Sequence, residues 1–374
     1  MPGVEEFEAT IADVYRRQVA VLPEGTEWFD AHTHTGSNDP DGFRATAEEI
    51  LAGLDMAGHR RALVFSSMEP DGYSQANDRV IAEAAGSGGR LVALCRLNPH
   101  DDAAGEARRC LEAGAVGFKL HPRAERFALH EPAVEEVIQL AHDRRAPVMI
   151  HAGRGIPALG RDTADLAARY PGARLILAHA GISDLSWIWR EAERLPNLFF
   201  DTAWWNVADL LALFALVPPG HILYASDMPY GHAVFNGLAL LRCGVATGLP
   251  PDTLAQLAGG HLAHLLEGGD PLDLGPAPGP PDAVPAPNAA RVSQHLTGAI
   301  GRTMGGADPT EALALAQLAC AVPDDVPERP LLAVCELMIE RSLEACAGLP
   351  EARRQVVGPA ISAALIAGTP SVPV

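Results

Sequence analysis

Several apolar segments of this chain end on a histidine or an aspartate that is followed within four residues by glycine or proline. These residues are His32, His34, His121, His151, His179 and Asp227. A single histidine in such a place is usually a hydrogen-bonded core or loop residue. Six such residues on five separate segments form a pattern that packing alone does not require. Because neutral imidazoles and one carboxylate suit Zn²⁺, Mn²⁺ or Fe²⁺, the set predicts a metal site with a coordination position open for water.

The spacing of His32 and His34 places both imidazoles on one face of a strand. Residues two apart in a strand point the same way, so these two side chains can bind one cation together. Asp30 has the same parity and is expected to point inward one layer deeper. There it would serve as a buried hydrogen-bonding support.

Lys119 is the only lysine among 28 basic residues, all the others being arginine. A position that keeps lysine where arginine serves elsewhere is one where the amine itself is expected to matter. Lys119 and His121 share parity, so only one of them can lie at the depth of the metal ligands. The alternative interpretation of Lys119 is an ion pair with an inward Asp30 or Asp201.

Eight short apolar segments alternate with longer amphipathic stretches between residues 26 and 228. The apolar segments are Glu27–His34, Arg61–Ser66, Leu91–Leu97, Ala115–His121, Pro147–His151, Arg174–His179, Asn197–Asp201 and His221–Asp227. Continuous apolar strands separated by helices indicate a parallel sheet covered on both faces. Eight units favour a closed (β/α)₈ TIM barrel of the α/β class, and an open doubly wound sheet is the alternative. In a barrel the strand ends form one mouth, where the histidines and Asp227 would converge.

The segments that flank the barrel divide the chain further. We expect an N-terminal helix in residues 1–25, the barrel in 26–274, a stiff proline-rich linker in 275–288 and a small all-α domain in 289–374. The helices expected in that domain are Ala290–Met304, Pro309–Ala321, Pro330–Ala347 and Glu351–Ala367. Their apolar faces must be buried, so we expect this C-terminal module to pack on the barrel or on a second copy, making a homodimer.

Six motifs together resemble the amidohydrolase superfamily, and most closely its amidohydrolase-related branch, which also holds decarboxylases of the aminocarboxymuconate-semialdehyde type. The motifs are Phe-Asp-Ala-His-Thr-His (29–34), Cys-Arg-Leu-Asn-Pro (95–99), Gly-Phe-Lys-Leu-His-Pro (117–122), Ile-His-Ala-Gly (150–153), Leu-Ala-His-Ala-Gly (177–181) and Ala-Ser-Asp-Met-Pro (225–229). The resemblance covers residues 26–268 and does not extend to the linker or the C-terminal module.

The resemblance implies which side chains do which chemistry. The implied metal ligands are His32, His34, His151 and Asp227. His179 would orient or deprotonate a metal-activated water or polarise the substrate, and Asp227 would accept the water proton and pass it to the leaving group. In members with two metals a strand-four lysine becomes a bridging carbamate, so Lys119 with His179 could hold a second ion. We expect one ion, with His121 as the strand-four alternative to Lys119.

Two reaction classes fit this set of residues. We expect hydrolysis of an amide, lactam, lactone or ester of a small molecule, and the alternative is non-oxidative decarboxylation of a small carboxylic acid. The third possibility is a barrel that binds a ligand or partner and catalyses no reaction. A decarboxylase also needs a cation for the departing carboxylate, for which Arg44, Arg96, Arg123 and Arg154 are candidates, although each is expected to be a solvated surface charge. Arg154, Trp204 and Tyr230 are expected to contact substrate.

Composition excludes other classes of protein. The formal net charge of −19 argues against a partner that is nucleic acid or an anionic membrane, since both need basic patches. The six cysteines contain no CxxC pair, which is typical of reduced thiols in a cytoplasmic protein. No stretch offers about 20 unbroken apolar residues, so we expect a soluble protein.

Overall fold

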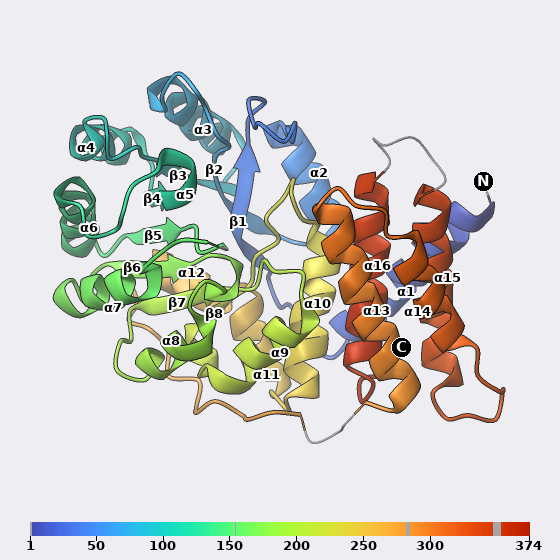
Figure 1. Ribbon diagram of the computed structural model, residues 1–374. Coiled ribbons are helices and arrows are strands. Elements are labelled where there is room, and N and C mark those ends of the chain that lie inside the picture. Colours follow the sequence, from blue (N-terminus) through green and yellow to red (C-terminus); the bar gives the residue numbers. More distant parts are fainter. Residues whose placement is uncertain (1, 154, 282–284, 347–352) are drawn as a thin grey trace.

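The computed structural model describes residues 2–153, 155–281, 285–346 and 353–374. Eight parallel strands follow one another in sequence order around a barrel (Figure 1). They are β1 (Phe29–Thr35), β2 (Arg61–Ser66), β3 (Leu91–Arg96), β4 (Gly117–Leu120), β5 (Pro147–Ile150), β6 (Arg174–Leu177), β7 (Leu198–Asp201) and β8 (Ile222–Leu223). The chain after β8 closes the ring, because the backbone N–H of Ala31 donates to the carbonyl of Tyr224 at 2.9 Å and that of His34 to Met228 at 2.7 Å. The predicted TIM barrel is confirmed, and the open sheet is excluded.

Helices follow the strands and cover the outside of the barrel (Figure 1). They are α2 (Ala47–Ala57), α3 (Ser74–Gly86), α4 (Ala103–Ala113), α5 (Pro122–Glu125), α6 (Pro132–Arg144), α7 (Leu159–Arg169), α8 (Leu185–Ala192), α9 (Val207–Leu216) and α10 (Ala233–Ala246). The helix α1 (Pro2–Val19) precedes the barrel, and α11 (Pro251–Ala255) and α12 (His261–Leu266) follow α10.

Both faces of each strand are buried, which explains why the segments lack an apolar–polar alternation. Leu63 and Phe65 belong to the apolar cluster inside the barrel, whereas Val64 packs in the cluster between strands and helices. Phe118 and Leu120 of β4 likewise face the outer cluster. Lys119 lies between them, and its side chain therefore points into the barrel, where it is fully buried.

Five of the expected strands end earlier than the sequence suggests, β3, β4 and β5 by one residue and β6 and β8 by more. The structure ends β6 at Leu177 and β8 at Leu223, so His179 and Asp227 lie beyond the regular strands rather than in them. Both residues have a left-handed backbone, with φ of 57° at His179 and 59° at Asp227. A strand cannot continue through this conformation, which is uncommon for residues other than glycine and occurs mostly at functional sites.

The C-terminal module consists of α13 (Pro287–Met304), α14 (Thr310–Cys320), α15 (Arg329–Cys346) and α16 (Arg353–Gly368). It lies against α1, α9 and α10 on one side of the barrel (Figure 1). Helix α13 begins inside the predicted linker, of which residues 282–284 are outside the described part of the chain. The barrel supplies a surface for this module, and a homodimer stays a prediction. Among the described residues, no helix is both long enough and apolar enough to cross a membrane.

A ring of aromatic side chains at the start of the barrel encloses His59, which is 3% exposed. Trp28 stacks on its imidazole with the ring centroids 4.5 Å apart, and the Tyr15 hydroxyl lies 2.8 Å from Nε2. Burial lowers the pKa of His59 from 6.5 to about 3. Between pH 6.5 and pH 3 the unfolded chain therefore binds a proton that the folded chain excludes, and the free energy of unfolding falls as the pH falls.

We predict that His59→Gln removes this pH dependence. Lowering the pH from 6.5 to 5 should shrink the difference in unfolding free energy between wild type and variant by about 2 kcal/mol, since one pH unit corresponds to about 1.4 kcal/mol. Urea unfolding of both proteins at both pH values measures this difference in unfolding free energy. Groups that titrate identically in the two proteins do not contribute to it. A difference that stays constant with pH would show that folding does not change the pKa of His59.

Candidate metal centre at the mouth of the barrel

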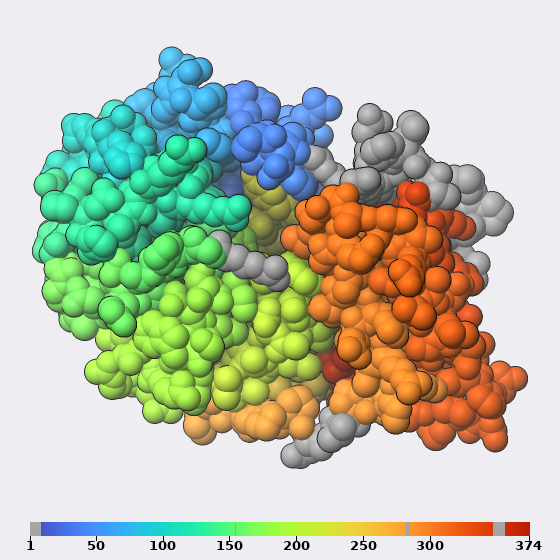
Figure 2. Space-filling view, viewed as in Figure 1, coloured from blue at the N-terminus to red at the C-terminus, as the bar shows by residue number. Residues whose placement is uncertain are grey.

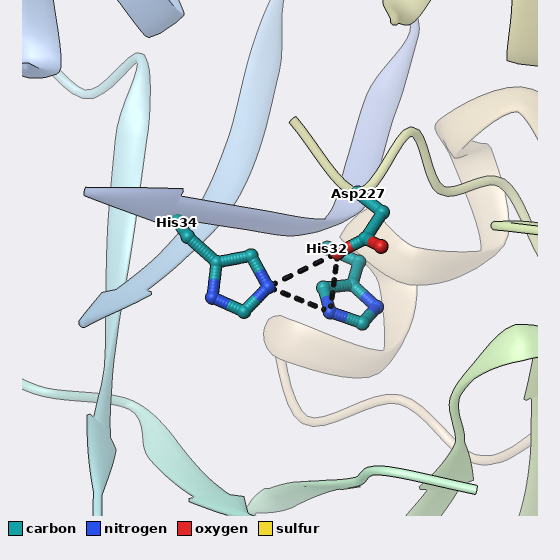
Figure 3. Close-up of side chains that lie close together, drawn as sticks. All are labelled: His32, His34 and Asp227. Carbon is teal, nitrogen blue, oxygen red and sulfur yellow. Dashed lines mark hydrogen bonds and ion pairs between the residues drawn. The ribbon is translucent and has the colours of Figure 1, made fainter. Parts of the chain in front are cut away.

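Three predicted ligands meet where β1 and the segment after β8 end (Figure 3). The Nε2 atoms of His32 and His34 lie 3.1 Å apart, and Asp227 Oδ1 lies 3.2 Å from the first and 3.1 Å from the second. Both histidines are buried, and the Asp227 side chain is 18% exposed. Two imidazole nitrogens and a carboxylate oxygen converging on one point fit a divalent transition metal.

Asp201, the last residue of β7, fixes the orientation of His32. The Nδ1–H of His32 donates to Asp201 Oδ2 at 2.7 Å, which leaves the lone pair of His32 Nε2 directed at His34 and Asp227. Asp201 Oδ1 also accepts from the backbone N–H groups of His179 and Ala203. A carboxylate behind a ligating imidazole is a common way to fix its tautomer. From the sequence we expected Asp201 only as a partner of Lys119, although it ends an apolar segment as the other site residues do.

We predict a large effect of Asp201→Asn on metal binding. The amide oxygen can still accept from the two backbone N–H groups, but the amide nitrogen then faces His32 and donates to Nδ1. That moves the ring proton of His32 to Nε2 and removes the lone pair that would bind a metal. Metal affinity, measured by competition with a chelator, should fall about 10-fold to 100-fold. Unchanged affinity would mean that His32 is not oriented by this carboxylate.

Asp30 lies one layer below the histidines, as its parity predicts. It is fully buried, and its Oδ1 accepts from the backbone N–H of His32 at 3.0 Å and of Ser226 at 2.9 Å. Burial raises the pKa of Asp30 to about 7. The carboxyl therefore joins β1 to the segment after β8 and holds the two ligand-bearing backbones together.

His151 and His179 form a pair beside the three ligands rather than joining them. His179 Nδ1–H donates to the carbonyl of Ala203 at 2.9 Å, so its Nε2 accepts from His151 Nδ1–H at 3.0 Å. This leaves the lone pair of His151 Nε2 buried, with no hydrogen-bond partner among the described residues. His179 Nδ1 lies 4.0 Å from Asp227 Oδ2. The structure thus brings together three of the four predicted ligands, whereas His151 pairs with His179 and its Nε2 faces Gly153.

Lys119 lies at the depth of the ligands, and His121 lies above it. The Nζ of Lys119 is 3.4 Å from His32 Nε2 and 4.7 Å from the centroid of Phe65. Burial lowers the pKa of Lys119 to about 7. Among the described residues, Lys119 forms no ion pair within 4.0 Å with Asp30 or Asp201, the two partners of the alternative interpretation. His121 instead stacks on His151 with centroids 3.8 Å apart, and its Nδ1 accepts from the N–H of Ala124 in α5.

Arg96 is not the solvated surface charge that we expected. It is 2% exposed and donates to Glu125 Oε1 at 2.7 Å, while its guanidinium lies over the ring of Tyr73. The reason is its place in the barrel, since Arg96 pairs in register with the inward-facing Lys119. Glu125 comes from the short helix α5, and nothing in the sequence singles it out. Arg44 and Arg123 are exposed, as expected.

Aromatic side chains form one wall of the mouth. The ring of Tyr230 meets the ring of His34 edge-on with centroids 5.0 Å apart, and its hydroxyl donates to Asp39 at 2.6 Å. Phe43 packs on Tyr230 from the segment after β1. Trp204 lies 6.3 Å from His179, between ring centroids. Figure 2 shows a hollow at this face, bordered by the loops of the barrel and, on one side, by the C-terminal helices. Arg154, the third predicted substrate contact, lies outside the described residues.

The sequence profile described as Amidohydrolase matches residues 29–236, which contain every residue of this centre. The chain belongs to the amidohydrolase family. Within this family, a 6-methylsalicylic acid decarboxylase of Penicillium expansum is 31% identical over 125 residues, a match that covers 28% of this chain and 38% of that protein.

Solved structures share the fold at low sequence identity. A 5-carboxyvanillate decarboxylase from Sphingomonas paucimobilis has a TM-score of 0.53 at 15% identity and covers 65% of this chain and 99% of its own. A 2,6-dihydroxybenzoate decarboxylase from Rhizobium has a TM-score of 0.53 at 14% identity, with the same coverage. A dihydroxybenzoic acid decarboxylase from Polaromonas, with bound manganese and the inhibitor 2-nitroresorcinol, has a TM-score of 0.53 at 15% identity and covers 65% and 97%.

Proposed function

We propose that this member of the amidohydrolase family is a metal-dependent decarboxylase that removes CO₂ from a small aromatic carboxylic acid without an oxidant. The observation that carries the proposal is the buried amine of Lys119, 3.4 Å from His32 Nε2, with the buried guanidinium of Arg96 on the adjacent strand. The charge of Arg96, of which Glu125 balances a part, and that of the protonated fraction of Lys119 suit an anionic substrate better than a neutral amide or ester. The decarboxylase activity of the relative from Penicillium expansum supports the same choice.

The residues at the mouth fit a divalent metal through His32, His34 and Asp227. His151 as a fourth ligand stays a prediction that would require its ring to turn, since its Nε2 faces Gly153. Zn²⁺ is our first expectation, with Mn²⁺ or Fe²⁺ as alternatives. When bound, such an ion would hold substrate oxygens and stabilise the negative charge that remains when CO₂ leaves.

The protein's own groups have separate roles in this proposal. Lys119 and Arg96 attract the carboxylate, and the rings of Tyr230 and Phe43 pack against the aromatic ring of the substrate. The bond between the ring carbon and the carboxyl carbon breaks, CO₂ departs, and the electron pair stays on the ring carbon. A proton from solvent then adds to that carbon, and His179, whose Nδ1 lies 4.0 Å from Asp227 Oδ2, is the group placed to relay it.

Hydrolysis by an activated water remains the competing function, because it would use the same three ligands. A matched panel separates the two: hydroxylated benzoic acids, with the amides and methyl esters of the same rings, incubated with metal-loaded protein. We expect CO₂ release and the decarboxylated ring from at least one acid. Cleavage of an amide or ester without CO₂ release would overturn the proposal in favour of a hydrolase. His34→Ala serves as the inactive control in both arms.

We predict one metal ion per chain, and Lys119→Arg tests this. Arginine keeps the charge but cannot form the carbamate that a second metal would need. Elemental analysis should find the same metal content in wild type and Lys119→Arg, with any loss of activity appearing as a higher KM for the acid. A fall from two ions to one in the variant would instead establish a two-metal centre.

A further inference from the structure

Helix α16 contacts α9 and α10, the two helices that follow the loops bearing Trp204 and Tyr230 (Figure 1). The contacts fall near the first turns of both helices, and so near the ends of those loops. The C-terminal module, in which the sequence shows no chemistry, is therefore joined to two walls of the substrate site.

The first contact joins Gly358 of α16 to Phe235 of α10. A methyl group on Gly358 would lie 2.7 Å from Cε2 of Phe235, so the helix and the ring are in close contact. The ring of Phe235 contacts that of His232 at a tilt of 37°, with centroids 4.8 Å apart, and His232 Nδ1 accepts from the N–H of Val234 to begin α10. His232 is two residues beyond Tyr230, whose ring meets His34. A continuous series of contacts thus runs from α16 to a metal ligand.

The second contact joins Gly368, at the end of α16, to Val207, the first residue of α9. A methyl group on Gly368 would lie 2.8 Å from a Val207 methyl carbon. The preceding residue, Asn206, caps α9 through its side chain, which accepts from the N–H of Ala208 at 3.0 Å. Trp204 is three residues before Val207, so this contact lies at the end of the loop that carries Trp204.

Arg242 prevents α16 from sliding along the barrel. Its guanidinium, fully buried on α10, donates to the hydroxyl and carbonyl of Thr369 and to the carbonyls of Val372 and Pro373. These acceptors follow the last residue of α16 directly. The position of α16 relative to α10 is therefore fixed at the end near Gly368, and tight packing fixes it near Gly358.

We propose that α16 is a brace that positions the Trp204 and Tyr230 loops for substrate binding, with Gly358 and Phe235 as positioning residues. The brace follows from the packing alone, whereas its effect on substrate affinity rests on the proposed function. A small displacement of Tyr230 would alter the fit of the substrate ring. Asp201 would still orient His32, and Asp30 would still hold the backbones of β1 and of the segment after β8 together.

The test is Gly358→Ala, with Gly301→Ala as the matched control. Both glycines lie within helices of the module, but a methyl group on Gly301 meets nothing within 4 Å, so only Gly358→Ala displaces Phe235. Gly358→Ala should raise KM for the aromatic acid about tenfold with kcat within about twofold and metal content unchanged. In a Phe235→Leu background, Gly358→Ala should have no further effect, because the smaller side chain removes the clash.

Hydrogen exchange of residues 228–236 gives a readout that needs no turnover. Gly358→Ala should accelerate exchange in this segment, and Gly301→Ala should not. If no acid is decarboxylated, the proposed function fails while the exchange measurement still decides the brace. Unchanged exchange together with an unchanged KM overturns the brace, as does an equal effect of Gly358→Ala in the Phe235→Leu background.

Discussion

Asp227→Ala is expected to abolish turnover and to remove the metal from the purified protein. Asp227 is the one carboxylate among the three converging ligands, and its oxygen lies within 3.2 Å of both His32 Nε2 and His34 Nε2. Two neutral imidazoles alone bind a divalent cation weakly, because the charge of the ion is no longer compensated. Losing the charge stabilisation that the ion supplies should cost about 10³-fold or more in kcat/KM.

The fold should survive this substitution. Asp227 lies at the mouth, and the apolar clusters inside and outside the barrel do not include it. Elemental analysis, kcat/KM and the thermal midpoint of metal-free protein together measure the effect. Asp252→Ala, an exposed aspartate on α11, is the matched control and should retain both metal and activity. Full activity of Asp227→Ala, or of wild-type protein freed of metal, would exclude this centre as the site of chemistry.

Arg242→Met should produce the largest loss of stability among single substitutions outside the mouth. The guanidinium is completely buried and donates four hydrogen bonds to the segment after α16. Burial lowers the pKa of Arg242 to about 10, which shows that holding this charge inside is itself unfavourable. Methionine relieves this cost, but the carbonyls that lose their donors cost more than is gained. The variant should therefore lose about 3–5 kcal/mol of unfolding free energy.

Denaturant unfolding and limited proteolysis measure this loss. We expect protease to cleave the C-terminal module of Arg242→Met while the barrel resists cleavage. The substitution removes the hydrogen bonds that attach the module and leaves the barrel core unchanged. Arg108→Met, an exposed arginine on α4, should match wild type in both measurements. A variant as stable as wild type would mean that apolar packing alone attaches the module.

Part of the candidate site followed from the sequence, and part did not. His32, His34 and Asp227 were identified because parallel strands place their carboxyl ends together, so residues that end strands must converge. Asp201 obeys the same rule and could have been found by it. Glu125 could not, because α5 is a four-residue helix whose direction is set by contacts across the mouth.

The sequence and the structure agree on the direction of some side chains and differ on that of others. Parity placed Asp30 and Lys119 inside the barrel, and both are there. Parity gave no reason for Arg96 to be a surface charge, and its burial follows from its pairing with Lys119. His151 has its Nδ1 directed at His179, away from the three ligands, because hydrogen bonds choose among ring orientations that the sequence leaves equivalent.

The sequence by itself determined a parallel sheet covered on both faces, since eight apolar segments without alternation can be buried on both faces only in such a sheet. The number of units favoured a barrel over an open sheet, and the contacts between β1 and the chain after β8 decided it. The sequence also determined that the helices after the linker must bury an apolar face. Only the tertiary structure decided which surface covers them, because Arg242 and Thr369 are far apart in the chain and meet only after the barrel has closed. The same holds for the 2.7 Å contact between His32 and Asp201, which joins β1 to β7. Local pattern thus specifies elements and faces, whereas partners between distant segments depend on how the closed barrel places them.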